Sequence, residues 1–240
     1  APRGAPPRRR PMGPARVAHL AGALPAVGTA AGFVVASWSG DIDPVNPFTG
    51  GEVSISRAMR NEPAVQVFRA FVLPSAALMA LTWVEVGRAL RAGGVRRGAQ
   101  RWTVGLGVLG AVFLVLYGSY LGTDGDVYRL MRRYGVYVFF GGTGIALTLA
   151  AVAWPSACAP RARKSLRVLS AGLWAAGPVQ LVHDHVVGRS DVLANALEWW
   201  IAAALMLAFA LLGALVGDGS DPSTAGASAP TEDDRVSDRP

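Results

Sequence analysis

The sequence is poor in charged residues and almost lacks cysteine. Charged residues make up 16% of its 240 residues, against roughly 25% in soluble domains. Cys158 is the single cysteine, so the chain can form neither an internal disulfide nor a cluster of thiolate metal ligands. These two shortages argue against an ordinary soluble domain and against a disulfide-stapled one.

Apolar residues are abundant instead, at 52% of the chain, and the mean hydropathy is +0.34 although both ends are polar. The net charge of +7 would suggest a nucleic-acid partner in a soluble protein. Here the arginines lie between apolar runs, where they act as an orientation signal in a membrane. We therefore expect a membrane protein with no nucleic-acid partner.

Six apolar runs approach the ~20 residues that a helix needs to cross ~30 Å of hydrocarbon. Inside a membrane, such runs must be helical because no water satisfies stray backbone groups. The sequence predicts an all-α integral membrane bundle of six transmembrane helices within residues 17–216. The runs are about 17–38, 64–86, 102–121, 134–154, 166–187 and 193–216.

Both flanks differ from this apolar region. Residues 1–16 combine five arginines with prolines and glycines, and residues 217–240 are rich in Asp, Ser, Pro and Ala. Neither can bury enough apolar surface to fold alone, so we expect a disordered basic tail and a disordered acidic tail. A basic stretch before an apolar run could also be a secretory signal peptide, but the run 17–38 is longer than a typical signal core and favours a retained span.

Basic connections alternate with mixed ones, which predicts the orientation. The first, third and fifth loops contain acidic residues, whereas the N-terminal flank, the second loop and the fourth loop are basic. We therefore expect a multi-pass cell-membrane protein with both termini in the cytoplasm. The basic residues of the second and fourth loops are Arg88, Arg91, Arg96, Arg97 and Arg101, then Arg161, Arg163, Lys164 and Arg167.

Glycine spacings within the spans suggest packing rather than ligand binding. Gly105, Gly107 and Gly110 match a dinucleotide-binding loop, but that loop needs a strand before it and an exposed helix start. An apolar run supplies neither, so we expect no cofactor. Glycines four apart, such as Gly28 and Gly32 or Gly118 and Gly122, allow close helix approach within the bundle; a homodimer or a partner membrane protein is the alternative.

His183, Asp184 and His185 resemble a metal site at first sight. Successive helical residues turn by about 100°, so the two histidines point to nearly opposite faces and cannot chelate one ion. We therefore predict no metal here, and a polar helix end at the outer interface.

Glu198 is the most informative charge. It lies about five residues into the last run, before Trp199 and Trp200, and an ionisable group at that depth should face the bundle interior and have a partner. The candidates for that partner, and with Glu198 for a binding site, are Arg69, Arg132, Arg133 and His183. The cluster is either a structural ion pair or a polar pocket in the outer half of the bundle, suited to a lipid headgroup.

Several polar motifs follow one another in a fixed order along the spans. They are Ile55-Ser56, Glu62-Pro63 before Phe68, Arg133-Tyr134-Gly135 before Phe139-Phe140, His183-Asp184, and Glu198-Trp199. In order and spacing, residues 17–216 resemble the damage-regulated autophagy modulator (DRAM-like) family of multi-pass membrane proteins, which includes proteins of lipid remodelling. The resemblance implies five or six spans, an extracytoplasmic first loop and a lipid-related role.

The chain also departs from that family pattern. Arg57 and Met59 stand where the first-loop motif usually has Asp and Gly, and Arg132 stands where a histidine often opens the fourth span. The Ala-, Gly- and Arg-rich composition is typical of a GC-rich bacterial genome, in which neither autophagy nor GPI anchors would be the context.

Three functions remain open at this level. The first is a non-catalytic protein that organises or senses membrane lipid, or regulates a partner. The second is a lipid-modifying enzyme in which His183 is the general base, oriented by Asp184 or Glu198, although its nucleophile is missing. The third is a small-solute transporter in which Glu198 carries a proton, which no interrupted helix pair or internal repeat supports.

Overall fold

The computed structural model describes residues 12–156 and 159–218, and every element in this part of the chain is a helix. The predicted tails, apart from the residues nearest the helices, and Cys158 lie outside the described residues. The elements are α1 (Pro14–Trp38), α2 (Pro47–Gly50), α3 (Ile55–Ala58), α4 (Ala64–Ala92), α5 (Arg97–Tyr120), α6 (Asp126–Ala153), α7 (Pro160–Val186) and α8 (Asp191–Asp218).

Each predicted apolar run lies in one long helix, and the helices extend into the polar connections. The clearest extension is α6, which begins eight residues before the run 134–154. Local chemistry explains several ends: Pro14 and Pro160 stand in the first turns of α1 and α7, where a missing N–H costs nothing. At the other end of a helix, Gly94 adopts φ +74° just after α4, a conformation that glycine reaches without strain.

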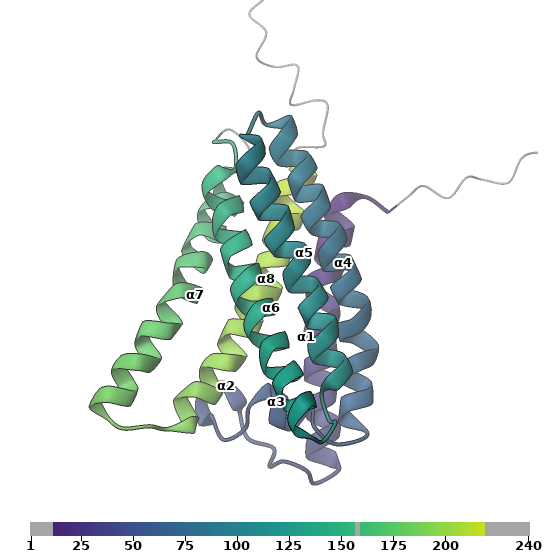
Figure 1. Cartoon of the computed structure of the whole chain (residues 1–240), viewed down its shortest axis with the longest axis vertical. Coiled ribbons are helices and arrows are strands. Elements are labelled where there is room, and N and C mark those ends of the chain that lie inside the picture. Colours follow the sequence, from purple (N-terminus) through teal and green to yellow (C-terminus); the bar gives the residue numbers. More distant parts are fainter. Residues whose placement is uncertain (1–11, 157–158, 219–240) are drawn as a thin grey trace, which may run out of the picture.

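Six long helices form a ring. α1 packs on α4, α4 on α5, α5 on α6, α6 on α7 and α7 on α8, and α8 closes the ring against α1. Figure 1 shows the two short helices α2 and α3 together at the lower end of the bundle, the end at which α4 and α8 begin. The opposite end holds the α4–α5 and α6–α7 connections and the end of α8.

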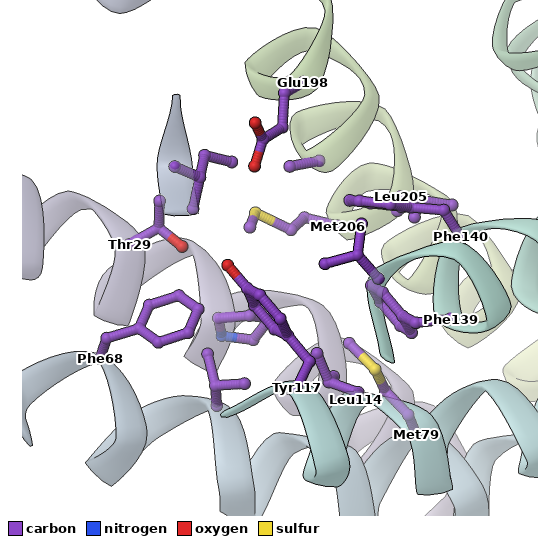
Figure 2. A pocket seen from close by; sticks show the side chains of 15 residues that line it. Thr29, Phe68, Met79, Leu114, Tyr117, Phe139, Phe140, Glu198, Leu205 and Met206 are labelled. Carbon is purple, nitrogen blue, oxygen red and sulfur yellow. The ribbon is translucent and has the colours of Figure 1, made fainter. Parts of the chain in front are cut away.

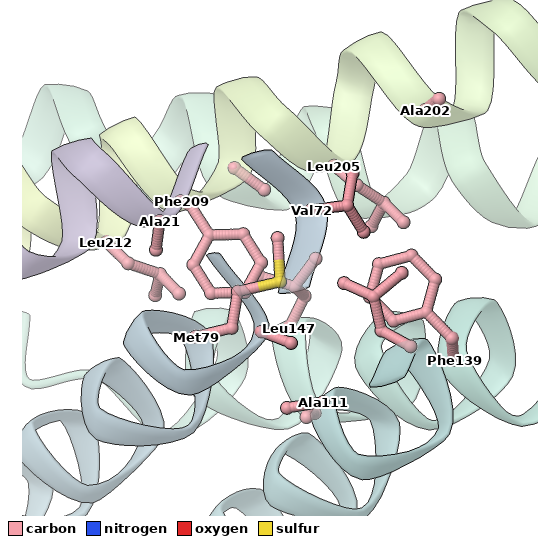
Figure 3. Packing of buried hydrophobic residues seen from close by; sticks show 14 of the residues in the cluster. Ala21, Val72, Met79, Ala111, Phe139, Leu147, Ala202, Leu205, Phe209 and Leu212 are labelled. Atoms are coloured by element: carbon pink, nitrogen blue, oxygen red, sulfur yellow. The ribbon is translucent and has the colours of Figure 1, made fainter. Parts of the chain in front are cut away.

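The core of the ring is apolar and closely packed. Trp83 of α4 and Phe209 of α8 meet edge to face with ring centroids 5.8 Å apart, and both are fully buried. Figure 3 shows Met79, Leu147 and Phe209 converging from α4, α6 and α8. The outer surface is also rich in large apolar side chains, as lipid contact requires; examples are Val27, Val34, Leu81, Val112 and Val152.

Among the described residues, five helices are long and apolar enough to cross a membrane, namely α1, α4, α5, α6 and α8. By length and hydropathy the structure thus supports five spans where the sequence predicts six. The exception is α7, which has 27 residues but a lower hydropathy because Arg167, Pro178 and Gln180 interrupt its apolar residues. It is also the least buried of the long helices, with only Leu166 and Ser170 buried among its described side chains.

The predicted glycine pairs pack inside the chain. A Cβ atom at Gly28 would lie 2.5 Å from Cβ of Phe71, and one at Gly32 would lie 2.4 Å from Sδ of Met59. These glycines therefore let α1 approach α4 and the first loop closely. Gly122 has φ +81°, and a Cβ atom there would lie 2.7 Å from the carbonyl oxygen of Arg60.

Candidate functional site

The first turns of α8 hold the first loop in place at the α2–α3 end of the bundle. The indole of Trp199 donates to the carbonyl of Val53 at 2.9 Å, and the amide of Asn195 donates to the carbonyl of Gly51 at 2.9 Å. Trp200 donates to the carbonyl of Phe48 at 3.1 Å. These contacts fix α3, and with it Ser56, against α8.

Glu198 meets Ser56 at this junction. The backbone N–H and the hydroxyl of Ser56 both lie 3.4 Å from Oε1 of Glu198, and the Ser56 hydroxyl is 3.0 Å from that of Tyr117 on α5. Because a carboxylate only accepts, Tyr117 donates to Ser56 and Ser56 donates to Glu198. We call Ser56, Tyr117 and Glu198 the polar triad.

The polar triad stands at one end of an apolar cavity of about 60 Å³. Figure 2 shows Glu198 of α8 and Tyr117 of α5 directed into this space, with Thr29, Phe68 and Met206 around them. A cavity of this volume holds a few water molecules. A small polar group of a ligand therefore fits here.

An open groove of about 380 Å³ adjoins this cavity between α1 and α8. The groove and the cavity share Thr29, Ile55, Ala202 and Met206 in their walls. A lipid lying in the groove would thus be separated from the polar triad by side chains only. The flexible thioether of Met206 is the most easily displaced of them.

Glu198 lacks the predicted cationic partner. The ion pairs found within the described residues join Arg88 to Glu85, Arg129 to Asp126 and His183 to Asp184. The second carboxylate oxygen, Oε2, has no hydrogen-bond partner in this part of the chain. Glu198 is thus a partly buried carboxylate held by Ser56 alone.

Arg69, the predicted partner, serves another purpose. Its guanidinium donates to the carbonyls of Gly118 at 3.0 Å, Ser119 at 3.1 Å and Leu121 at 2.5 Å. These carbonyls end α5, where helix carbonyls lack intrahelical donors and the helix dipole favours a cation. The predicted ion pair between Arg69 and Glu198 is therefore wrong. Arg69 instead caps the end of α5.

Arg132 contributes to the same cap from α6. It donates to the carbonyl of Tyr120 at 3.2 Å and to that of Thr123. Arg133 is exposed on the same helix. Neither arginine forms an ion pair with Glu198 within the described residues, so the predicted cluster does not assemble around that carboxylate.

His183 lies apart from the polar triad, in the last turn of α7. Its Nδ1 is 3.7 Å from Oδ1 of Asp184, and Gln180 donates to that same carboxylate at 2.7 Å. The enzymatic hypothesis names Asp184 or Glu198 as the group that orients His183; Asp184 lies beside it, and no contact joins His183 to Glu198 among the described residues. No group of three or more potential metal ligands occurs in the part of the chain that the structure describes.

The residue that sequence reasoning missed is Tyr117. It lies in an apolar run of α5 and is 6% exposed, and its position depends on Gly135 of α6, where a Cβ would lie 2.9 Å from Cβ of Tyr117. The tyrosine gives no sequence signal of its own. Only the approach of α5 to α3 brings its hydroxyl to Ser56.

These helices define the class of the protein: a multi-pass membrane bundle that is all-helical over the described residues, where five helices are apolar enough to span. No family model, curated protein or solved structure matches the chain.

Proposed function

We propose that this protein is a non-catalytic, DRAM-like membrane protein that binds the ammonium-bearing headgroup of a membrane lipid at Glu198. The observation that carries the proposal is the carboxylate of Glu198, which faces an apolar cavity without a cationic partner among the described residues. A carboxylate at such a depth is costly unless a cation compensates it. A lipid ammonium group is comparable to a water molecule in size and fits the space.

The surroundings of the cavity support a lipid rather than a soluble ligand. The adjoining groove between α1 and α8 is lined mainly by apolar side chains, including Ala26, Phe33 and Val34. It faces the membrane, so an acyl chain can lie in it while the headgroup reaches past Met206. The protein thus offers the two environments that an amphiphile needs.

Two of the motifs that carry the resemblance to the DRAM-like family contact each other in the structure, which supports the proposed family. Ser56 of the Ile55-Ser56 motif hydrogen-bonds Glu198 of the Glu198-Trp199 pair, although the two are far apart in the sequence. The proposal places the protein in the cell membrane of a bacterium with both termini in the cytoplasm. The polar triad then lies in the outer half of the bundle.

The proposal is tested by adding lipids to the purified protein in detergent and measuring the midpoint of thermal unfolding. Phosphatidylethanolamine should raise the midpoint of the wild-type protein more than phosphatidylcholine, whose quaternary ammonium is larger and donates no N–H hydrogen bond. Glu198→Gln should abolish that difference while the protein stays folded, because glutamine keeps an acceptor for Ser56 but no charge.

His183→Ala is the matched control. It removes a second predicted site residue, which lies outside the polar triad. It should leave the phosphatidylethanolamine effect intact. Equal responses of the wild type and Glu198→Gln would refute the headgroup site. A membrane lipid converted to a new species only when both His183 and Glu198 are present would show that the protein is an enzyme.

A further inference from the structure

A second charged site lies at the other end of the bundle, between α4 and α5. Arg88 and Arg91 of α4 and Arg97 and Arg101 of α5 line one groove of about 740 Å³. Arg88 stands nineteen positions after Arg69 on α4, which corresponds to roughly 28 Å along the helix axis. The groove is therefore remote from the polar triad, and its function is independent of the one proposed there.

The charge of this groove is largely uncompensated. Glu85 pairs with Arg88, but Arg91, Arg97 and Arg101 form no ion pair among the described residues. All four arginines are exposed, so the guanidinium groups of Arg91, Arg97 and Arg101 can turn toward a ligand. Guanidinium groups bind phosphate through paired N–H donors.

Beneath the arginines the groove is lined by Gly87 and Gln100, which are buried, and by Val104, which is half-buried. A Cβ at Gly87 would lie 2.4 Å from Cγ2 of Val104, so α4 and α5 are in close contact beneath the arginines. By contrast, a Cβ at Gly105 would meet nothing within 4 Å. The helices thus touch at the base of the groove and leave room above it.

The groove continues as an apolar stripe toward the middle of the bundle. On α4, Leu81 and Val84 precede Arg88 at helical spacing, and on α5, Leu109 and Val112 follow Arg101 and Gly105 in the same way. Leu81 and Val112 are more than half exposed. Trp102, beside Arg101, is 66% exposed, as is typical of a tryptophan at the membrane–water interface.

We propose that this groove binds an anionic phospholipid, with its phosphate among the four arginines and its acyl chains along the apolar stripe. Basic pockets between helices at the cytoplasmic interface have the charge that acidic lipid headgroups need. The apolar stripe distinguishes a lipid from a free phosphate, which would use the arginines alone. The site is defined by two helices and needs no residue of the polar triad.

The test is a titration of the purified protein with phosphatidylglycerol in detergent, with bound lipid counted by native mass spectrometry. The double variant Arg97→Gln/Arg101→Gln should bind about twenty-five-fold more weakly than the wild type, since each basic residue near an anionic surface contributes about a fivefold effect. High salt should weaken wild-type binding because the arginines are exposed.

Two further variants separate the groove from general surface charge. Arg161→Gln/Lys164→Gln removes the same charge from the start of α7, at the same end of the bundle, and should leave phosphatidylglycerol binding unchanged. Gly105→Leu fills the groove without removing charge and should weaken binding. Since Gly105 faces open space and the arginines are exposed, these variants should fold, which thermal unfolding verifies.

Three outcomes would overturn the proposal. Equal binding of phosphatidylglycerol and phosphatidylcholine would show that the anionic headgroup is not recognised. Unchanged binding by Arg97→Gln/Arg101→Gln would place the lipid elsewhere. Displacement of the lipid by inorganic phosphate at comparable concentration would show that the groove is a site for soluble phosphate.

Discussion

Arg69 and Glu198 enter the bundle from the same end, yet each has its own partners. Arg69 donates to three carbonyls at the end of α5, whereas among the described residues Glu198 accepts only from Ser56. The difference follows from valence and geometry: a guanidinium has five donors in a fixed fork and suits a helix end that presents several free carbonyls. The carboxylate of Glu198 is therefore the group to which the proposal assigns the lipid headgroup.

Replacement of Arg69 by methionine should therefore lower the free energy of unfolding by about 3 kcal/mol, because charged hydrogen bonds are lost and carbonyls at the end of α5 become unpaired. Thermal unfolding in detergent measures this loss. Arg57→Met, at an exposed arginine near the same end, is the control and should change stability little. If the two variants unfold alike, Arg69 does not cap α5.

At the scale of the element, two of the α5 glycines whose spacing resembles a nucleotide-binding loop serve helix packing instead. A Cβ at Gly107 would lie 2.2 Å from the indole of Trp83, and one at Gly110 would lie 2.6 Å from Oγ1 of Thr143. These glycines lie where α4 and α6 press against α5. Gly105 lies on the opposite, open side.

Gly107→Ala should accordingly destabilise the protein by about 1–3 kcal/mol, because the added methyl group forces the buried Trp83 to move. Gly105→Ala, two positions away on the same helix, should be neutral or stabilise by up to about 1 kcal/mol through helix propensity. Chemical denaturation of the two variants in one detergent compares them directly. Equal stabilities would mean that α5 does not pack on Trp83 as described.

At the scale of the whole molecule, α7 links opposite ends of the ring although it is less apolar than its neighbours. Arg163 and Arg167 donate to the carbonyls of Trp154 and Ala151 at the end of α6. At its other end α7 leads into α8, whose Asn195 bonds the first loop. α7 therefore connects the two ends of the bundle, and the sequence prediction of six spans requires that α7 crosses the membrane together with the five helices that are apolar enough to span it.

Cysteine labelling in intact cells tests this crossing. Cys158, the single cysteine, stands between α6 and α7 and should react with a membrane-impermeant reagent only after the cytoplasmic side is opened. In the variant Cys158→Ser/Ser190→Cys, the new cysteine stands between α7 and α8 and should react from outside. Reaction of both positions from the same side would show that α7 does not cross.

The sequence by itself determined the class of this protein and the rough bounds of its helices. Apolar runs of sufficient length can only be helical in a membrane, and this holds whatever the neighbours are. The importance of Glu198 followed in the same way from the cost of burying a charge. The partner of Glu198 could not be predicted in this way. The predicted pairing with Arg69 is wrong, because the sequence offers several cations and does not reveal which of them lies near the carboxylate.

Only the tertiary structure decided which side chains meet. Tyr117 joins Ser56 and Glu198 because three helices converge there, and four arginines of α4 and α5 form one groove because Gly87 lets those helices touch. Such contacts depend on the relative positions of helices, which are set by side-chain packing over the whole bundle. Local hydropathy specifies that a helix forms, but it carries little information about the neighbour that each face will contact.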